Sequence, residues 1–210
     1  MGVERLIYTA DCVAEGADWL ASENARFAWA IKQTGPLPLR LREDGFEELL
    51  SAIVSQQVSV ASAKAIWSRM QSVSLTKSEK ILIASDEDLK GCGLSRQKMR
   101  YARALAEARI DYTGLRALPS DQVVQTLTKV IGVGVWTAEI YAMFSLGRAD
   151  VFASGDLALQ ESTRLLFKLE ARPTESSLRS MAQAWSPWRS VAARLLWAYY
   201  RVAKDREGIR

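Results

Sequence analysis

Two glycines, Gly132 and Gly134, precede a helix-like run, and Asp156 follows twenty residues after Trp136. Glycine permits positive φ angles and has no Cβ atom, so a tight turn here can point successive backbone N–H groups outward. The start of the next helix adds partial positive charge, and the two features together can bind a phosphate group. Thr137 can add a hydroxyl to such a site. A Gly-x-Gly pair is equally compatible with an ordinary turn between two helices.

Asp156 is one of 24 acidic residues and can serve as the N-cap of the helix expected over residues 157–168. The chain has no histidine, which excludes Ser–His–Asp chemistry, Cys–His pairs and histidine metal centres. Any general base must therefore be Asp, Glu, Lys or Tyr. Cys12 and Cys92 stand eighty residues apart without a CxxC motif, which argues against a disulfide framework or a cysteine-ligated metal site. No metal site made of side chains is expected.

The composition predicts a globular protein with an anionic partner. With 210 residues, 49% of them hydrophobic, the chain can form one large domain or two small ones. A formal net charge of +4 and a pI near 9.1 suit a polyanion. No apolar run approaches the ~20 residues of a membrane span, and the N-terminus lacks a signal-peptide pattern. We therefore expect a soluble, intracellular monomer, in the cytoplasm with the nucleoid or in the nucleus.

Hydrophobic residues recur with a helical period along almost the whole chain, and no strand pattern persists. The pattern thus predicts an all-α fold. Helices are expected over residues 11–23, 25–33, 45–70 with a new helix start at Ser59, 95–110, 119–130 and from about Trp188 to Ala203.

Two glutamines interrupt the apolar stripe of the helix that begins near Phe46. Gln57 falls where that stripe would continue after Ile53 and Val54, and Gln56 is its neighbour. A polar residue here indicates either the end of the helix or a side chain that points into a cleft.

Two further positions leave a structural and a functional interpretation open. Trp197 shares a helix face with Ser190 and Arg194, so it could stack on a nucleobase or cover a neighbouring helix. Lys98 belongs to a basic cluster at the start of a helix that follows Gly93. That cluster could form a solvated face or contact a second phosphate.

Four blocks of sequence, in this order along the chain, resemble the DNA-3-methyladenine glycosylase II family of the helix-hairpin-helix/GPD superfamily. They are AIVSQQVSV, GCGLSRQKMRYARALA, IGVGVWTA with DVFASGDLAL, and WSPWRSVAARLLWAYY, from about residue 46 to 200. The resemblance implies two helical subdomains that flank a cleft, with a helix-hairpin-helix motif for DNA binding. Residues 45–148 would form the subdomain that ends in the hairpin, and residues 1–44 plus 149–210 the one that carries the aspartate. At the N-terminus some relatives carry an extra β-rich domain that this chain does not match.

The resemblance also assigns roles to residues. It implies that Asp156 is the catalytic carboxylate and that Trp197 is a pocket residue. Gln57 matches the wedge that fills the gap left by an extruded base, although relatives often have an apolar residue here. The remaining candidates are Trp136 and Gln56 in the base pocket, and Gly132, Gly134, Thr137 and Lys98 at the DNA backbone.

The implied activity is removal of alkylated bases, such as 3-methyladenine and 7-methylguanine, from duplex DNA in base excision repair. Bifunctional relatives have a lysine nucleophile where this chain has Trp136, so the resemblance implies a glycosylase without lyase activity. No cofactor is required, although the hairpin of the family can bind a monovalent cation through backbone carbonyls. The alternatives are a superfamily glycosylase for deaminated or oxidised bases, an inactive DNA-damage binder, and a helical interaction module without a DNA role.

Overall fold

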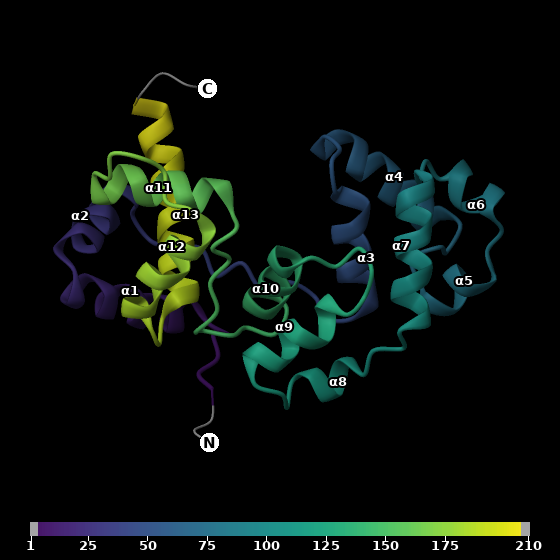
Figure 1. The fold of residues 1–210 in the computed structure, drawn as a ribbon, viewed down its shortest axis with the longest axis horizontal. Helices are drawn as coiled ribbons and strands as arrows, with labels where there is room; N and C mark the ends of the chain where they lie inside the picture. Colours follow the sequence, from purple (N-terminus) through teal and green to yellow (C-terminus); the bar gives the residue numbers. More distant parts are fainter. Residues whose placement is uncertain (1–3, 207–210) are drawn as a thin grey trace. The chain divides into compact units, whose positions relative to one another are not determined.

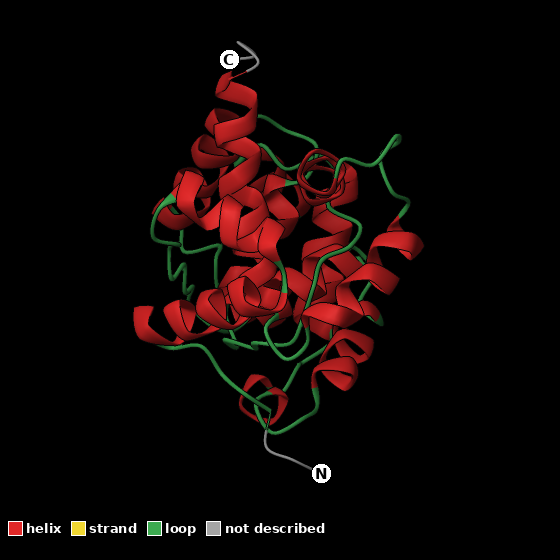
Figure 2. Ribbon diagram, turned by 90° about the vertical axis from the view of Figure 1, so that its left-hand side faces the viewer, coloured by secondary structure: helices red, strands yellow, loops and turns green. Residues whose placement is uncertain are grey.

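The computed structural model describes residues 4–206, and within that range it contains thirteen α-helices and one short 3₁₀ helix. Extended pairing in these residues is limited to an isolated antiparallel bridge between Leu6 and Arg148, and Figure 2 shows helices joined by loops. The all-α fold predicted from the sequence is confirmed. None of the described helices has the length and apolar character needed to cross a membrane.

The chain divides into two compact units, and each has its own core. Unit 1 combines Met1–Leu41 with Ala142–Arg210, and unit 2 is Arg42–Tyr141. The chain passes from unit 2 back into unit 1 within a single helix, α10 (Val135–Phe144). Unit 1 is therefore built from two separate stretches of sequence, whereas unit 2 is continuous. The cleft expected between two subdomains stays a prediction.

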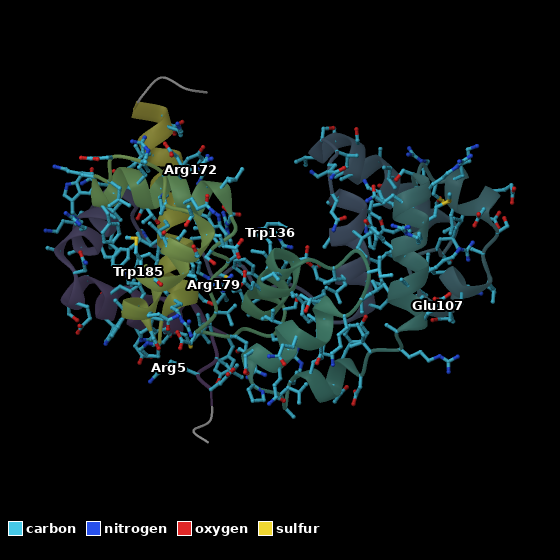
Figure 3. The ribbon with its side chains drawn as sticks, in the orientation of Figure 1. Arg5, Glu107, Trp136, Arg172, Arg179 and Trp185 are labelled. Atoms are coloured by element: carbon cyan, nitrogen blue, oxygen red, sulfur yellow. The ribbon has the colours of Figure 1, made fainter. Side chains whose placement is uncertain are left out.

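Unit 1 is organised around its longest helix, α13, which packs against α1, α2 and α11 (Figure 1). Its buried centre is aromatic: the ring of Phe27 lies edge-on to Phe167 and Trp185, with centroids 5.6 and 5.4 Å away. Trp185 is labelled in Figure 3 and is only 4% exposed. The helices of unit 1 are α1 (Ala10–Glu23), α2 (Ala25–Thr34), α11 (Leu157–Phe167), α12 (Glu175–Met181), η1 (Ala182–Trp185) and α13 (Arg189–Arg206).

In unit 2, α7 lies at the centre and contacts α3, α5 and α6. The predicted apolar stripe of α3, which includes Leu50, Ile53 and Val54, is buried. The predicted helix start at Ser59 is confirmed, because its Oγ accepts a hydrogen bond from the Ser62 backbone N–H at 3.1 Å. The helices are α3 (Phe46–Ser55), α4 (Val60–Ser72), α5 (Ser78–Ile83), α6 (Asp86–Gly91), α7 (Arg96–Glu107), α8 (Tyr112–Leu115), α9 (Ser120–Thr128) and the first part of α10.

The sequence pattern did not predict α5, α6, α8 and α12. They are four to seven residues long, too short for a 3.6-residue period to stand out. One of them carries a local signal that the pattern of apolar residues does not capture. Ser85 and Asp88 form a capping box at the start of α6, in which each side chain accepts a hydrogen bond from the other residue's backbone N–H.

Candidate DNA-binding hairpin and carboxylate site

The two glycines of the turn between α9 and α10 have different environments. Gly132 has a φ of +97°, and a Cβ atom added there would lie 2.4 Å from Cγ of Tyr101. Gly134 is exposed, and a Cβ atom there would meet nothing within 4 Å. Its carbonyl accepts the first helical hydrogen bond of α10, from the Ala138 N–H at 3.0 Å. The turn therefore requires glycine at position 132 for its own geometry, while Gly134 leaves the surface open beside the first amides of α10.

A cavity of about 230 Å³ lies in unit 2 between α3 and α10. Trp136 is 45% exposed and extends from the first turn of α10 (Figure 3). Thr137 is only 6% exposed, so its hydroxyl belongs to the cavity wall in this structure, and its contact with DNA stays a prediction. The cavity is lined by Arg42, Glu48, Leu49, Ser51, Ala52, Ser55, Gln56, Trp136, Thr137, Ile140 and Tyr141.

Tyr141, which lines this cavity, is held by a small polar network. Its phenol donates a hydrogen bond to Asp44 and accepts one from the Gly45 N–H at 2.9 Å. Asp44 also forms an ion pair with Arg116 at 2.6 Å. Burial raises the pKa of Tyr141 well above its usual range, and the hydrogen bond to Asp44 raises it further. The phenol therefore stays neutral and acts as a fixed wall of the cavity.

Gln56 and Gln57 stand at the end of α3. Gln56 is the C-cap residue, and its Nε2 donates a hydrogen bond to the Gly132 carbonyl at 2.9 Å. Gln57 is exposed and has a left-handed backbone with φ +55°. The helix end indicated by these polar residues is confirmed. Gln56 therefore joins the cavity wall to the glycine turn, and Gln57 protrudes beside it.

Asp156 is the N-cap of α11, as the sequence predicts. Its Oδ1 accepts hydrogen bonds from the N–H groups of Ala158 and Leu159 at 2.9 and 3.0 Å. A third donor, Nε1 of Trp197, lies 3.3 Å from the same oxygen. N–H donors and a helix N-terminus both favour negative charge at this point. The carboxylate is therefore oriented by two elements of unit 1, the start of α11 and the middle of α13.

The loop before Asp156 is held from inside by a residue that the sequence pattern did not single out. Gln160 is 7% exposed, and its Nε2 donates to the carbonyl of Ser154 at 2.9 Å. Ser154 itself is fully buried. The sequence signal that could have identified Gln160 is an amide side chain one helical turn after the capping residue Asp156. It fixes the loop that delivers Asp156.

Trp197 shares a face of α13 with Ser190, Arg194 and Arg201, as the sequence predicts, but the part of that face formed by Ser190 and Arg194 is buried. Ser190 and Arg194, which share that face, are 0% and 1% exposed. The Arg194 guanidinium donates to the carbonyls of Leu39 at 3.1 and 3.2 Å and of Ser190 at 2.9 Å. It also lies 4.8 Å from the ring centroid of Phe144, which is 5.9 Å from the Trp197 ring. Burial lowers the pKa of Arg194 to about 10. At Ser190 and Arg194 the face is thus an interior one, where backbone carbonyls satisfy the charge of Arg194.

Lys98 is in a different setting from the surface cluster in which the sequence placed it. It is 8% exposed, and its Nζ donates a hydrogen bond to the Val54 carbonyl at 2.6 Å. Its neighbours Arg96 and Arg100 are exposed. In this structure the Lys98 ammonium therefore binds the protein interior, and a phosphate contact by Lys98 is not part of the geometry.

No cluster of three or more His, Cys, Asp or Glu side chains that could hold a metal occurs among residues 4–206. In the turn before α10, the carbonyl of Val130 accepts from the Val133 N–H at 3.0 Å, and that of Gly132 accepts from Gln56. A monovalent cation at the hairpin carbonyls stays a prediction, and none of the contacts described above requires it.

Three features define the class of the protein: the all-α fold, the glycine hairpin, and Asp156, which caps α11 twenty residues after Trp136 in the first turn of α10. Residues 50–189 match the sequence model of the HhH-GPD superfamily of base excision DNA repair proteins, and the chain belongs to that superfamily. The resemblance to 3-methyladenine DNA glycosylases that the sequence motifs indicated is confirmed by individual relatives.

One relative is DNA-3-methyladenine glycosylase 1 of Schizosaccharomyces pombe, which is 31% identical over 80% of this chain and 78% of its own length. The crystal structure of a DNA-3-methyladenine glycosidase from Bacillus halodurans has a TM-score of 0.80 at 34% identity, covering 88% of each chain. The S. pombe 3-methyladenine DNA glycosylase in complex with abasic DNA has a TM-score of 0.75 at 30% identity, covering 87% of this chain and 95% of that one. The chain is thus a base excision repair glycosylase similar to 3-methyladenine DNA glycosylases.

Proposed function

We propose that this protein is a monomeric, monofunctional DNA glycosylase that extrudes alkylated purines from duplex DNA and hydrolyses their N-glycosidic bonds. The observation that carries the proposal is the arrangement of Asp156, whose Oδ1 accepts from Ala158, Leu159 and Trp197. The relatives support the substrate, since all three described above are named for 3-methyladenine and one of them is in complex with abasic DNA. Abasic DNA is the product that such an enzyme leaves behind.

The chemistry suits a site that has a carboxylate and no histidine. An N3- or N7-alkylated purine carries a positive charge, so it leaves with the electron pair of the glycosidic bond as a neutral base, without prior protonation. The sugar then develops oxocarbenium character, which a fixed carboxylate stabilises. A water molecule adds to C1′ and its proton passes to solvent. In this reaction Asp156 stabilises the cationic sugar and orients the water, and no general acid is needed.

The hairpin and the end of α3 would bind the DNA. We assign the first amides of α10, beside the exposed Gly134, to a backbone phosphate, because a helix N-terminus with open access is a ready anion site. Gln57 is exposed and protrudes at a left-handed backbone position, which suits the wedge role. It would fill the gap in the base stack after extrusion.

Trp136 is proposed to stack on the extruded base at the mouth of the cavity that Gln56 also lines. A ring face attracts a cation by about 0.5–2 kcal/mol, so we expect Trp136→Ala to slow release of cationic 7-methylguanine by up to roughly thirtyfold. Release of a neutral base such as hypoxanthine should fall less. The measurement is single-turnover base release from the two duplexes. An equal loss on both bases would contradict a cation-selective stacking role, and Trp136→Phe is the variant that retains a ring.

Trp197 is proposed to hold Asp156 as well as to contact the extruded base. Trp197→Phe removes the Nε1 donor, which lies 3.3 Å from Asp156 Oδ1, but keeps an aromatic ring next to Phe144. A hydrogen bond to a charged group is worth about 1.5–3 kcal/mol. Because this one is long, we expect the single-turnover rate to fall roughly tenfold. Substrate affinity should change little. A rate equal to that of the unmodified protein would mean that the backbone N–H groups alone orient the carboxylate.

The direct test is base release by the wild-type protein from duplexes that contain one lesion each. Free 3-methyladenine and 7-methylguanine, with DNA strands that break only after alkali, is the expected result. Strand cleavage without alkali, or trapping of a covalent complex by borohydride, would show lyase activity and contradict the monofunctional assignment. Release confined to uracil, hypoxanthine or 8-oxoguanine would move the substrate to deaminated or oxidised bases. Binding without any release would indicate an inactive DNA-damage binder.

A further inference from the structure

The end of α3 is held by Lys98, a residue of another helix. The last carbonyl groups of an α-helix have no partner within the helix and attract cations. One of them, on Val54, accepts a hydrogen bond from Lys98 Nζ at 2.6 Å. Val54 is fully buried and Lys98 is 8% exposed. Burial also lowers the pKa of Lys98. The ammonium group thus caps a helix end inside unit 2.

The segment that Lys98 holds contains the two glutamines of the proposed site. Gln56 follows Val54 by two residues, and its Nε2 reaches the Gly132 carbonyl at 2.9 Å. Gln57 comes next, with its left-handed φ of +55° and an exposed side chain. Because so few bonds separate Val54 from these residues, its position sets where both side chains emerge.

The helix that carries Lys98 also supports the DNA-binding turn. Tyr101 follows Lys98 by three residues, so both lie on one side of α7. The Tyr101 ring packs so closely on Gly132 that a Cβ atom there would lie 2.4 Å from Cγ. The Tyr101 hydroxyl accepts from Gln97 Nε2 at 2.6 Å, which fixes the ring. The α7 helix is therefore a common support for the end of α3 and for the hairpin turn.

We propose that Lys98 is a positioning residue, which fixes the end of α3 so that Gln56 reaches the hairpin and Gln57 is presented to the DNA. The inference rests on the proposed function, since it concerns the same site. It replaces the phosphate contact that the sequence suggested for Lys98. Three contacts connect α7, the end of α3 and the hairpin turn: Lys98 with Val54, Gln56 with Gly132, and Tyr101 with Gly132.

A phosphate contact and a positioning role differ in their dependence on salt. Each lost phosphate contact reduces the slope of log affinity against log salt by about 0.9. We expect Lys98→Met to leave the slope for a duplex with an abasic-site analogue unchanged, while affinity and single-turnover base release fall roughly tenfold. Arg96→Met is the matched control, since it removes an exposed cation two residues away on the same helix. If Arg96 contacts a phosphate, its variant loses slope. A reduced slope for Lys98→Met would overturn the positioning role.

A double variant tests the connection to Gln56. If Lys98 acts through the segment that carries Gln56, Lys98→Met and Gln56→Leu together should reduce affinity by clearly less than the product of the two separate effects. Fully multiplicative effects would contradict the coupling. Both measurements use DNA binding, so they remain informative even if the protein proves to release no base. Absence of base release by the wild type would then count against the proposed function alone.

A measurement on the unmodified protein covers the case in which Lys98→Met does not fold. Acetylation of lysines by a water-soluble reagent, followed by mass spectrometry, reports the access of each amine. A buried, hydrogen-bonded Lys98 should react slowly in the free protein, and addition of DNA should not change its rate. Fast acetylation of Lys98 that DNA suppresses would identify a phosphate contact and refute the proposal. Lys64, which is exposed on α4, is the internal reference for an accessible amine.

Discussion

Asp156→Asn is expected to lower the rate of base release by roughly 100- to 1,000-fold, the scale for loss of one electrostatic stabiliser of a transition state. Asparagine caps helices about as well as aspartate. Its side-chain oxygen can keep the bonds from the Ala158 and Leu159 N–H groups that Asp156 Oδ1 now accepts. The substitution therefore removes the charge that would stabilise the sugar cation and leaves the start of α11 intact. Stability should change by less than about 1 kcal/mol.

The matched control for this variant is Asp150→Asn. Asp150 is another acidic residue of unit 1, but its carboxylate serves the fold: it accepts from Arg189 at 2.6 and 3.0 Å and from Ser186 at 2.8 Å. We expect Asp150→Asn to lower the urea midpoint and to keep the rate of base release by the folded protein. The two rates are measured under single-turnover conditions on 7-methylguanine duplexes. Equal activity of Asp156→Asn and the wild type would remove Asp156 from the centre of the mechanism.

The second large effect is expected at the glycine turn, where Gly132→Ala and Gly134→Ala should behave differently. Alanine at position 132 would have to adopt a φ of +97° and would clash with the Tyr101 ring. Left-handed backbone costs a non-glycine residue roughly 1–2 kcal/mol, and the clash adds to that. We expect Gly132→Ala to destabilise the fold by about 2–4 kcal/mol. At position 134 a methyl group meets no protein atom within 4 Å, so the fold should be unaffected.

For DNA affinity the larger effect is expected at Gly134, whereas for stability it is expected at Gly132. The methyl group of Gly134→Ala would stand beside the first amides of α10, where the phosphate is proposed to bind. We expect its affinity for duplex DNA to fall roughly tenfold, the scale of one lost hydrogen bond to a charged group. Urea unfolding gives the stability of each variant, and fluorescence anisotropy with a labelled duplex gives its affinity. Unchanged affinity of Gly134→Ala would place the phosphate elsewhere. Unchanged stability of Gly132→Ala would contradict the close packing on Tyr101.

Local signals made much of the fold and part of the site predictable. The caps at Ser59 and Asp156 act on backbone groups two or three residues away, so the sequence around them contains the whole interaction. The glycine pair and the helix end at Gln56 were recognisable for the same reason.

The interior charges were not predictable, because their partners are remote in the sequence. Lys98 donates to a carbonyl 44 residues away, and Arg194 to one 155 residues away. On a helical wheel both residues lie close to other basic residues. Nothing nearby in the sequence distinguishes them from cations that are exposed to solvent. A long basic side chain can reach the carbonyl of another helix only when that helix is packed beside it. Tertiary structure therefore determines the burial and the hydrogen-bond partners of Lys98 and Arg194, and the sequence pattern did not predict either.

The division of unit 1 into two stretches of sequence has a consequence for how the chain is made. A ribosome completes α1 and α2 before the other described helices, whereas α13, which packs against both, is made after the rest of them. Phe27, fully buried in the finished protein, lacks its contacts with Phe167 and Trp185 until those two residues have been synthesised. Unit 2, continuous from Arg42 to Tyr141, can fold meanwhile. The hairpin of unit 2 can therefore form before the carboxylate site, while the apolar faces of α1 and α2 stay uncovered until α11 and α13 have been synthesised.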